Sequence, residues 1–209
     1  MGGRGHELDF GRFHFIGEGF ERGALRVRSS APLPAAPERL TRAEATVATP
    51  ISFEHDEGTR TEDFLGTTWA ALDLLSDRFV EVLSGFTGWQ TYAVVIVGRD
   101  GERVPGYHGL SVTGRCGRVE WERSERVILP APVPGGRTTG GWRGLYFSPS
   151  SWDGSDIFVP NDGSTFVIVT DEVRAAAEDA RLTNVRFARL TEFERNWNRT
   201  PDGEMVFGP

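Results

Sequence analysis

The segment 157–181, IFVPNDGSTFVIVTDEVRAAAEDAR, decides the fold that we expect for this chain. Its first half holds two β-prone runs, 157–159 and 165–169, that are rich in Ile, Val and Phe. Pro-Asn-Asp-Gly-Ser stands between them, and such a cluster of turn residues is typical of the connection in a β-hairpin. The first half of the segment therefore predicts two antiparallel strands.

The second half of the segment has the period of an amphipathic helix. Thr170 is suited to cap the helix, and Asp171 and Glu172 place negative charge at the positive end of the helix dipole. We expect the helix to run to about Arg181. The apolar residues that should pack on the sheet recur at i, i+3, i+4 and i+7, and they are Val173, Ala176, Ala177 and Ala180.

Strands and one further helix are expected elsewhere. Residues 8–29 resemble a pair of strands, and the continuous run 92–97, YAVVIV, predicts a buried strand. Residues 107–113 and 185–190 predict two more strands. Ser76 fits the N-cap of a short helix whose apolar face consists of Phe79, Val80 and Leu83.

These elements predict a single α+β domain over residues 1–209. We expect a mixed or antiparallel sheet with about two main helices. Two segments rich in Pro and Gly, near residues 31–37 and 130–144, should be irregular, because proline resists both helix interiors and central strands.

Charge and cysteine content narrow the classes of partner and compartment. The 209 residues carry a formal net charge of −7, which argues against nucleic acid as the main ligand. No apolar run approaches the length of a membrane span, and the first ten residues lack the apolar core of a signal peptide. With Cys116 as the single cysteine, the chain has no intrachain disulfide, which fits the cytoplasm.

The densest group of titratable residues lies in the stretch 54–63, EHDEGTRTED, which we expect to be exposed. A plain solvated acidic loop explains it well. As a binding surface, it would suit a basic protein partner, because complementary charge speeds encounter. The candidate partner-binding residues in this stretch are Glu54, Asp56, Glu57, Glu62 and Asp63.

The stretch 151–158, SWDGSDIF, is a second candidate, because it places a tryptophan and two carboxylates around a glycine turn. Asp153 and Asp156 are suited to bind backbone donors and to fix the entry into the next strand. The alternative is that Trp152, Asp153 and Asp156 form a recognition site for an Arg-rich partner. The sequence leaves both roles open.

The sequence predicts no catalytic residue, no metal ligand set and no cofactor. It contains no G-x-S-x-G elbow, phosphate-binding loop, dinucleotide fingerprint or H-E-x-x-H motif. An enzyme with an unfamiliar site near His55 or Cys116 remains an alternative. For Cys116 the ordinary interpretation is a buried, inert thiol.

Four elements in the second half of the chain resemble those of immunity proteins from bacterial polymorphic toxin systems. They are YHGLSVTGRCGRVEW, SWDGSDIF, FVIVTDEV and LTNVRFARL, within residues 107–190. Some related groups carry paired C-x-x-C motifs, which this chain lacks, so no zinc site is carried over. The resemblance implies a cytoplasmic protein that neutralises a cognate toxin by noncatalytic binding, and it implies no catalytic residues.

The leading functional hypothesis is therefore toxin neutralisation through protein–protein binding. The alternatives are the enzyme described above and a housekeeping interaction protein unrelated to toxins. The identity of the toxin, the interface and the oligomeric state are left open by the sequence.

Overall fold

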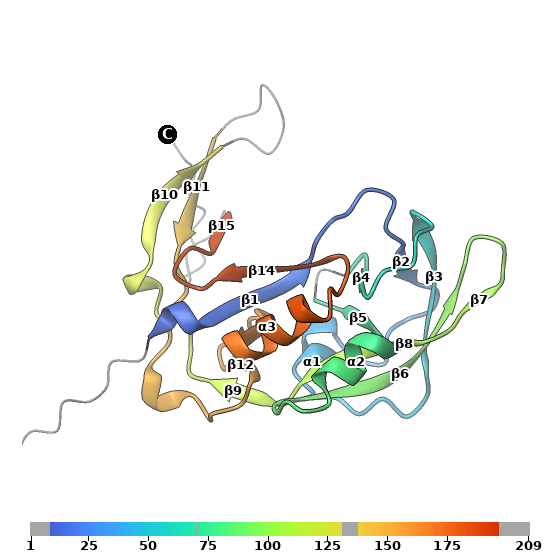
Figure 1. Cartoon of the computed structure of the whole chain (residues 1–209), viewed down its shortest axis with the longest axis horizontal. Coiled ribbons are helices and arrows are strands. Elements are labelled where there is room, and N and C mark those ends of the chain that lie inside the picture. The colour runs from blue at the N-terminus through green and yellow to red at the C-terminus, as the bar shows by residue number, and fades with distance from the viewer. Residues whose placement is uncertain (1–8, 70, 131–137, 197–209) are drawn as a thin grey trace, which may run out of the picture.

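The computed structural model describes residues 9–69, 71–130 and 138–196 (Figure 1). Within these ranges the chain forms a mixed α+β fold in which sheet dominates over helix, with strands arranged in three sheets. Among the described residues, no helix combines the length and the apolar character needed to cross a membrane.

A five-stranded sheet forms one side of the body. Its strands, in spatial order, are β14 (Val185–Arg189), β1 (Phe13–Glu18), β13 (Ile168–Thr170), β12 (Ile157–Pro160) and β9 (Gly114–Cys116). All neighbours in this sheet are antiparallel except β12 and β9, which are parallel. Both faces of β1 are covered, since nearly every residue of this strand is buried.

A seven-stranded sheet curls into a nearly closed barrel on the other side. Its strands are β2 (Arg26–Ser29), β3 (Ile51–Glu57), β6 (Trp89–Val97), β8 (Tyr107–Val112), β5 (Asp73–Ser76) and β4 (Phe64–Gly66), with β7 (Arg103–Val104) paired to β6. An isolated bridge between Val27 and Thr67 joins the two outer strands. This bridge brings β2 and β4 together, and their neighbourhood forms one wall of the site described below.

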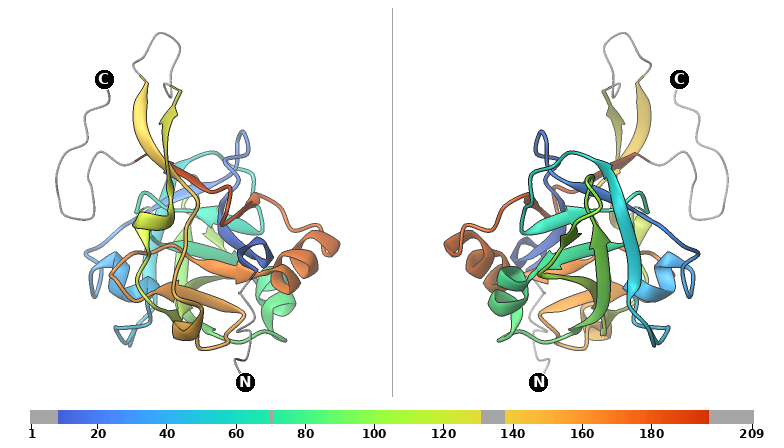
Figure 2. Two further views of the ribbon diagram at one scale, coloured as in Figure 1. Left: turned by 90° about the vertical axis from the view of Figure 1, so that its left-hand side faces the viewer. Right: turned by 90° about the vertical axis from the view of Figure 1, so that its right-hand side faces the viewer.

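A small third sheet consists of β10 (Glu125–Leu129), β11 (Thr139–Arg143) and β15 (Glu194–Asn196). Figures 1 and 2 show that β10 and β11 project away from the body as a two-stranded arm.

The helices are short and lie on the outside of the sheets. They are α1 (Pro37–Thr41), α2 (Asp77–Leu83) and α3 (Asp171–Asp179). Three single 3-10 turns occur at Phe10–Arg12, Trp121–Arg123 and Pro149–Ser151. Helices α2 and α3 lie side by side on one flank of the molecule (Figure 2) and contact each other.

Three apolar clusters hold these layers together. An aromatic cluster centred on Phe13, Phe147 and Phe158 packs against one face of the five-stranded sheet. A second cluster, which includes Phe79 and Val173, lies between the helices and the sheets. The third fills the barrel with side chains such as Phe53, and burying each such side chain contributes about 1.5–3 kcal/mol.

Most of the predicted elements of the last third are confirmed. Strands β12 and β13 form an antiparallel pair, and Thr170 stands at the N-cap position of α3. Val173 and Ala177 are buried, whereas Ala176 and Ala180 are partly exposed. Two details are wrong: the second strand begins at Ile168 rather than Thr165, and the Thr170 side chain makes no capping bond.

Other predictions need correction. The two strands within residues 8–29 exist, but β1 and β2 belong to different sheets and do not pair. The strand at 92–97 is largely open on one face, because β6 turns Tyr92, Val94 and Ile96 toward the barrel core and leaves Ala93 exposed. The third helix, α1, was not predicted, because Pro37 was interpreted as part of a loop although it stands at the first turn of α1, where proline is tolerated.

The irregular segments are confirmed only in part. Residues 31–36 form neither helix nor strand. The prediction of a loop through residue 144 is wrong for 139–143, which form β11 in the arm, and residues 131–137 lie outside the described part of the chain.

Candidate functional site

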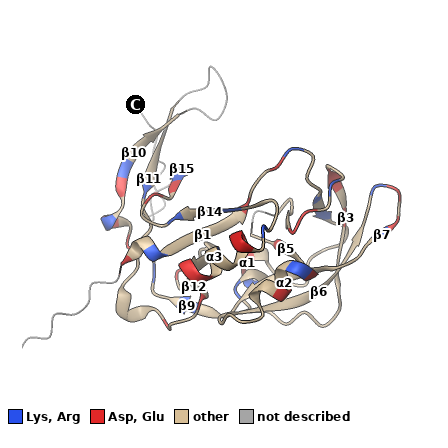
Figure 3. Cartoon of the chain, in the orientation of Figure 1, with Lys and Arg blue, Asp and Glu red and all other residues tan. Residues whose placement is uncertain are grey.

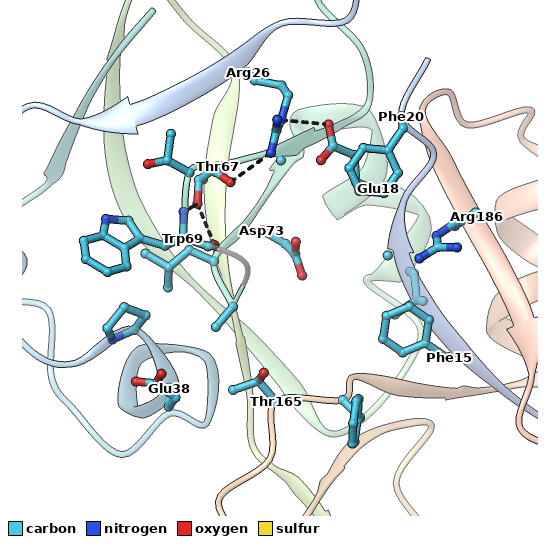
Figure 4. Close-up of a pocket in the computed structure, with 18 of the residues that line it drawn as sticks. Phe15, Glu18, Phe20, Arg26, Glu38, Thr67, Trp69, Asp73, Thr165 and Arg186 are labelled. Carbon is cyan, nitrogen blue, oxygen red and sulfur yellow. Dashed lines mark hydrogen bonds and ion pairs between the residues drawn. The ribbon is translucent and has the colours of Figure 1, made fainter. Parts of the chain in front are cut away.

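A hollow of about 370 Å³ lies where the five-stranded sheet meets the barrel (Figure 4). Its walls come from β1 and β14 on one side and from β2, β5 and the residues after β4 on the other. Helix α1 contributes Pro37 and Glu38 to the rim. Because segments distant in sequence converge here, the hollow is a product of the tertiary fold.

Two carboxylates face this hollow from opposite walls. Glu18 is the last residue of β1 and is only 9% exposed, whereas Asp73 is the first residue of β5 and is partly open to the hollow. Figure 4 shows the Asp73 carboxylate in the middle of the space, with Glu18 and Arg26 above it. Arg26 Nε lies 3.5 Å from Glu18 Oε1, too poorly aligned for a hydrogen bond, and both atoms are buried without one among the described residues.

The ionisation of these groups is displaced by burial. Burial raises the pKa of Glu18, and the charge of Arg26 offsets only part of this effect. Burial and the negative charge of Glu18 together raise the pKa of Asp73 to about 7. The pKa of Tyr92 is also raised, mainly by burial and to a smaller extent by the negative charge of Asp73. The Tyr92 hydroxyl has no hydrogen bond to a described residue. The carboxylates are therefore held in a setting that disfavours their charge.

Gly66 in β4 makes room for the Glu18 carboxylate. A Cβ atom at this position would lie 2.0 Å from Glu18 Oε2, closer than real contacts allow. Any larger residue would push the carboxylate out of its place. The closeness of β4 to the end of β1 thus depends on a glycine.

Exposed aromatic side chains flank the hollow. Among the described residues, three large hydrophobic side chains are strongly exposed, and two of them, Phe20 (63%) and Trp69 (47%), line it. Phe20 has a left-handed backbone with φ of 56°, which is unfavourable for a bulky residue. Strain of this kind persists only when the surroundings impose it, and it clusters at functional sites.

Two further hollows adjoin this one. One, of about 230 Å³, shares Glu18, Phe20 and Arg26 with it, and the other, of about 550 Å³, shares Trp69. We call these three adjoining hollows the aromatic groove.

The acidic stretch predicted from the sequence forms part of a cross-strand ladder. Glu54 and Glu57 on β3 lie opposite Arg28 and Arg26 on β2, each pair separated by 2.9 Å. Acidic and basic segments accordingly lie next to each other at β3 (Figure 3). Asp56 is exposed and forms no ion pair or hydrogen bond within the described residues. Asp56 and Glu57 line the two side hollows of the aromatic groove.

The prediction that Glu62 and Asp63 are exposed is wrong, because both residues are only 8% exposed. Glu62 pairs with Arg60. Asp63 accepts hydrogen bonds from Ser76 Oγ at 2.8 Å and from the backbone amide of Thr183 at 2.9 Å, and it pairs with Arg78. These carboxylates connect parts of the fold and are largely covered by it.

The stretch 151–158 has the structural role that was one of its two predicted alternatives. Trp152 packs edge-on against Phe13, with ring centroids 5.1 Å apart, and its indole Nε1 donates to the carbonyl of Ser155. Asp153 accepts from the backbone amide of Arg115, and Asp156 accepts from that of Thr87. Each of the three side chains therefore fixes the local backbone.

The two positions considered for an unfamiliar enzyme, Cys116 and His55, each have a local partner or a buried setting in the fold. Cys116 is buried, and its burial raises the pKa of the thiol to about 12, so the thiol stays protonated. His55 bonds the carbonyl of Gly58 in the adjacent turn, and His108 faces Asp77. Within the described ranges, no three His, Cys, Asp or Glu side chains converge in a way that would hold a metal ion.

Comparison with models of known protein families finds no match for the chain, and a search of curated protein sequences finds none either.

Sequence reasoning missed Glu18, Phe20, Trp69 and Asp73. One signal was present: Asp73 is the single charged residue in the apolar run 69–75, WAALDLL, where a strand would bury it. Glu18 likewise interrupts the apolar and glycine-rich run 15–20, FIGEGF. A lone carboxylate within an apolar strand is a signal of a special environment, and here both carboxylates face the same hollow.

The raised pKa of Asp73 makes a prediction about stability. The folded chain holds a proton on Asp73 up to about pH 7, whereas the unfolded chain releases it near the ordinary value of 3.8. The free energy of unfolding should therefore fall as the pH rises from about 4 to 7. Asp73→Asn removes this loss, so at pH 8 we expect its melting temperature to exceed that of the unchanged protein by roughly 2–4 °C, the shift that about 1 kcal/mol produces at this length.

Thermal unfolding of both proteins at pH 5 and pH 8 measures this effect. The difference between them should be smaller at pH 5. A variant that is less stable than the unchanged protein at pH 8 would show that the Asp73 charge is compensated in the folded state.

Proposed function

We propose that the protein binds and neutralises a cognate toxin protein in the bacterial cytoplasm, without catalysing a reaction, and that the aromatic groove is its binding surface. The observation that carries this proposal is the placement of Phe20 and Trp69. Two of the three strongly exposed large hydrophobic side chains of the described residues border the same groove. Exposed aromatic residues beside buried polar groups are typical of the anchors that dominate protein–protein binding.

The resemblance of residues 107–190 to immunity proteins supports toxin neutralisation over a housekeeping interaction. The three adjoining hollows, of about 370, 230 and 550 Å³, support a macromolecular partner. Asp56 lies in the groove and is unpaired among the described residues, so it suits a basic partner surface.

The test is to co-express the protein with the product of the neighbouring gene and to score growth. Protection by binding requires a stable complex of defined stoichiometry, which size-exclusion chromatography of the copurified proteins would show. Growth rescue with no such complex would contradict the proposal.

Truncating the aromatic anchors should weaken the complex. Phe20→Ala and Trp69→Ala should each lower affinity about 30-fold, equivalent to about 2 kcal/mol, mainly through faster dissociation. Surface plasmon resonance against the neighbouring gene product measures both rates. Ile128→Ala is the matched control, because Ile128 is 66% exposed on β10 and lies outside the groove. If all three substitutions had equal effects on affinity, the aromatic groove would not be part of the interface.

A second candidate function is acid–base catalysis at Asp73 and Glu18. Two carboxyl groups that share a pocket, one of them with a pKa of about 7, are an arrangement that enzymes use for proton transfer. An enzyme of this kind would protect cells at a small fraction of the molar amount of toxin. Binding predicts that protection ends when toxin exceeds the protein.

A further inference from the structure

Asp73, at the deep end of the aromatic groove, has no cationic partner among the described residues, and Glu18 is paired there only with Arg26, at 3.5 Å. Glu18 is more than nine-tenths buried, and its Oε1 atom has no hydrogen bond within the described part of the chain. The Asp73 carboxylate also forms no hydrogen bond or ion pair to a described residue, although it lies in the middle of the hollow (Figure 4). Buried carboxylates are normally paired, so an unpaired Asp73 and an incompletely satisfied Glu18 that face the same hollow indicate a ligand that supplies donors.

The arginines that line the hollow already have partners, and one of them, Arg26, also forms the 3.5 Å ion pair with Glu18. Arg26 donates to Glu57 at 2.9 Å and to the carbonyl of Thr67. Arg186 lies over the rings of Phe15 and Phe20, at 5.8 and 5.7 Å from their centroids. Arg195 lies over the ring of Phe166. None of them lowers the pKa of Asp73, whose displacement comes from burial and from Glu18 alone.

The arrangement of the carboxylates and of the aromatic rim favours a planar cationic group as the ligand. The two carboxylates approach from opposite walls, and the rim carries the aromatic faces of Phe20 and Trp69. A guanidinium group presents five N–H donors in one plane, binds carboxylates through two parallel bonds and stacks on aromatic rings. An ammonium group is compact and strongly hydrated, so it gains less from such a rim. A hollow of about 370 Å³ has ample space for an arginine side chain.

We infer that the deep end of the groove binds the guanidinium group of an arginine side chain on the protein partner, between Glu18 and Asp73. This inference rests on the proposed function, since it names the residue by which the toxin is held. Buried arginines are among the side chains that contribute most to protein–protein affinity, because paired charges in a desolvated pocket are costly to separate.

The probe for this site is L-argininamide, which has the side chain and lacks a free carboxylate. L-citrullinamide has nearly the same shape with a neutral ureido group, and L-lysinamide carries an ammonium. Titration of the folded protein at pH 8, followed by NMR, should show argininamide binding at least tenfold tighter than the other two compounds. Equal binding of citrullinamide, or equal binding of lysinamide, would overturn the assignment of a guanidinium site.

Matched variants locate the binding. Asp73→Asn and Glu18→Gln keep the size of each side chain and should each weaken argininamide binding at least tenfold. Asp100→Asn removes an equal charge from the exposed turn after β6 and should change nothing. Gly66→Ala, which displaces Glu18, should act like Glu18→Gln. Argininamide affinity that is unchanged in Asp73→Asn would overturn the proposal.

Affinity should also fall as the pH decreases from 8 to 6, because protonation of the carboxylates removes the attraction. The ionisable or charged groups facing Asp73 from the surrounding elements are Glu18, Arg26, Glu38, Tyr92, Arg186 and Arg195. Of these, Glu18 is the other carboxylate in contact with the proposed site. Asp73→Asn should flatten the pH dependence, and an undiminished dependence in this variant would count against the site.

Competition between argininamide and the neighbouring gene product tests the guanidinium site separately from the proposed function. Saturating argininamide should displace the neighbouring gene product from the protein. Argininamide that binds in an Asp73-dependent manner without displacing the toxin would overturn the assignment to a partner side chain. A toxin complex that is fully retained in Asp73→Asn would overturn the guanidinium site and leave the proposed function standing.

Discussion

Asp63→Ala should lower the free energy of unfolding by about 4 kcal/mol, the largest loss that we expect from any single change discussed for this protein. The Asp63 carboxylate accepts from Ser76 Oγ, from the backbone amide and hydroxyl of Thr183, and from Arg78 at 3.0 Å. Ser76 caps α2, and Thr183 lies between α3 and β14. One buried carboxylate thus fixes the start of one helix and the exit of the other.

The size of the loss follows from what the substitution leaves behind. Without the carboxylate, the amide of Thr183 and the hydroxyl of Ser76 lose their acceptor, and each unsatisfied buried donor costs about 1–3 kcal/mol. Urea unfolding followed by circular dichroism measures the change, and Asp100→Ala in the exposed turn after β6 is the control. A loss below 1 kcal/mol would mean that water replaces these bonds and that Asp63 is accessible after all.

The sequence predicted local elements better than it predicted their assembly. The 3.6-residue period over Val173 to Ala180 correctly indicated α3, because helical packing depends on neighbours four residues away. The partners of β1 and β2 were not predictable in the same way. Strand pairing joins residues as distant in sequence as Phe13 and Thr170. The alternation of apolar and polar residues within one strand does not indicate which sheet the strand joins.

The residues of the candidate site were even harder to predict from the sequence than the strand pairing. An acidic run such as 54–63 is conspicuous in a sequence, yet cross-strand arginines on β2 neutralise part of it and the fold buries another part. Glu18 and Asp73 are inconspicuous in sequence because 54 positions separate them. They meet only because the end of β1 approaches the barrel where β4 passes beside it at Gly66. A pair created by tertiary structure has no local motif.

The two tryptophans Trp69 and Trp152 allow the distinction between binding and stability to be tested with one residue type. Trp152 is partly buried and packs against the aromatic cluster, in contact with Phe13 and with Phe158 at 5.7 Å, and its indole nitrogen donates to the carbonyl of Ser155. Trp69 is 47% exposed at the rim of the aromatic groove. The same substitution should therefore have opposite consequences at the two positions.

Trp152→Ala should lower the free energy of unfolding by about 3 kcal/mol, because it removes a large aromatic side chain from a packed cluster and leaves a cavity. The dissociation rate of the toxin should stay within about twofold of normal at temperatures where the variant is folded. Trp69→Ala should change stability by less than about 0.5 kcal/mol, as is usual for exposed positions, while it accelerates dissociation as described above. The free energy of unfolding and the dissociation rate should be measured for both variants, so that stability and binding are compared at both positions. If Trp152→Ala instead accelerated dissociation at unchanged stability, the stretch 151–158 would be a recognition site and the interface would have to extend beyond the aromatic groove.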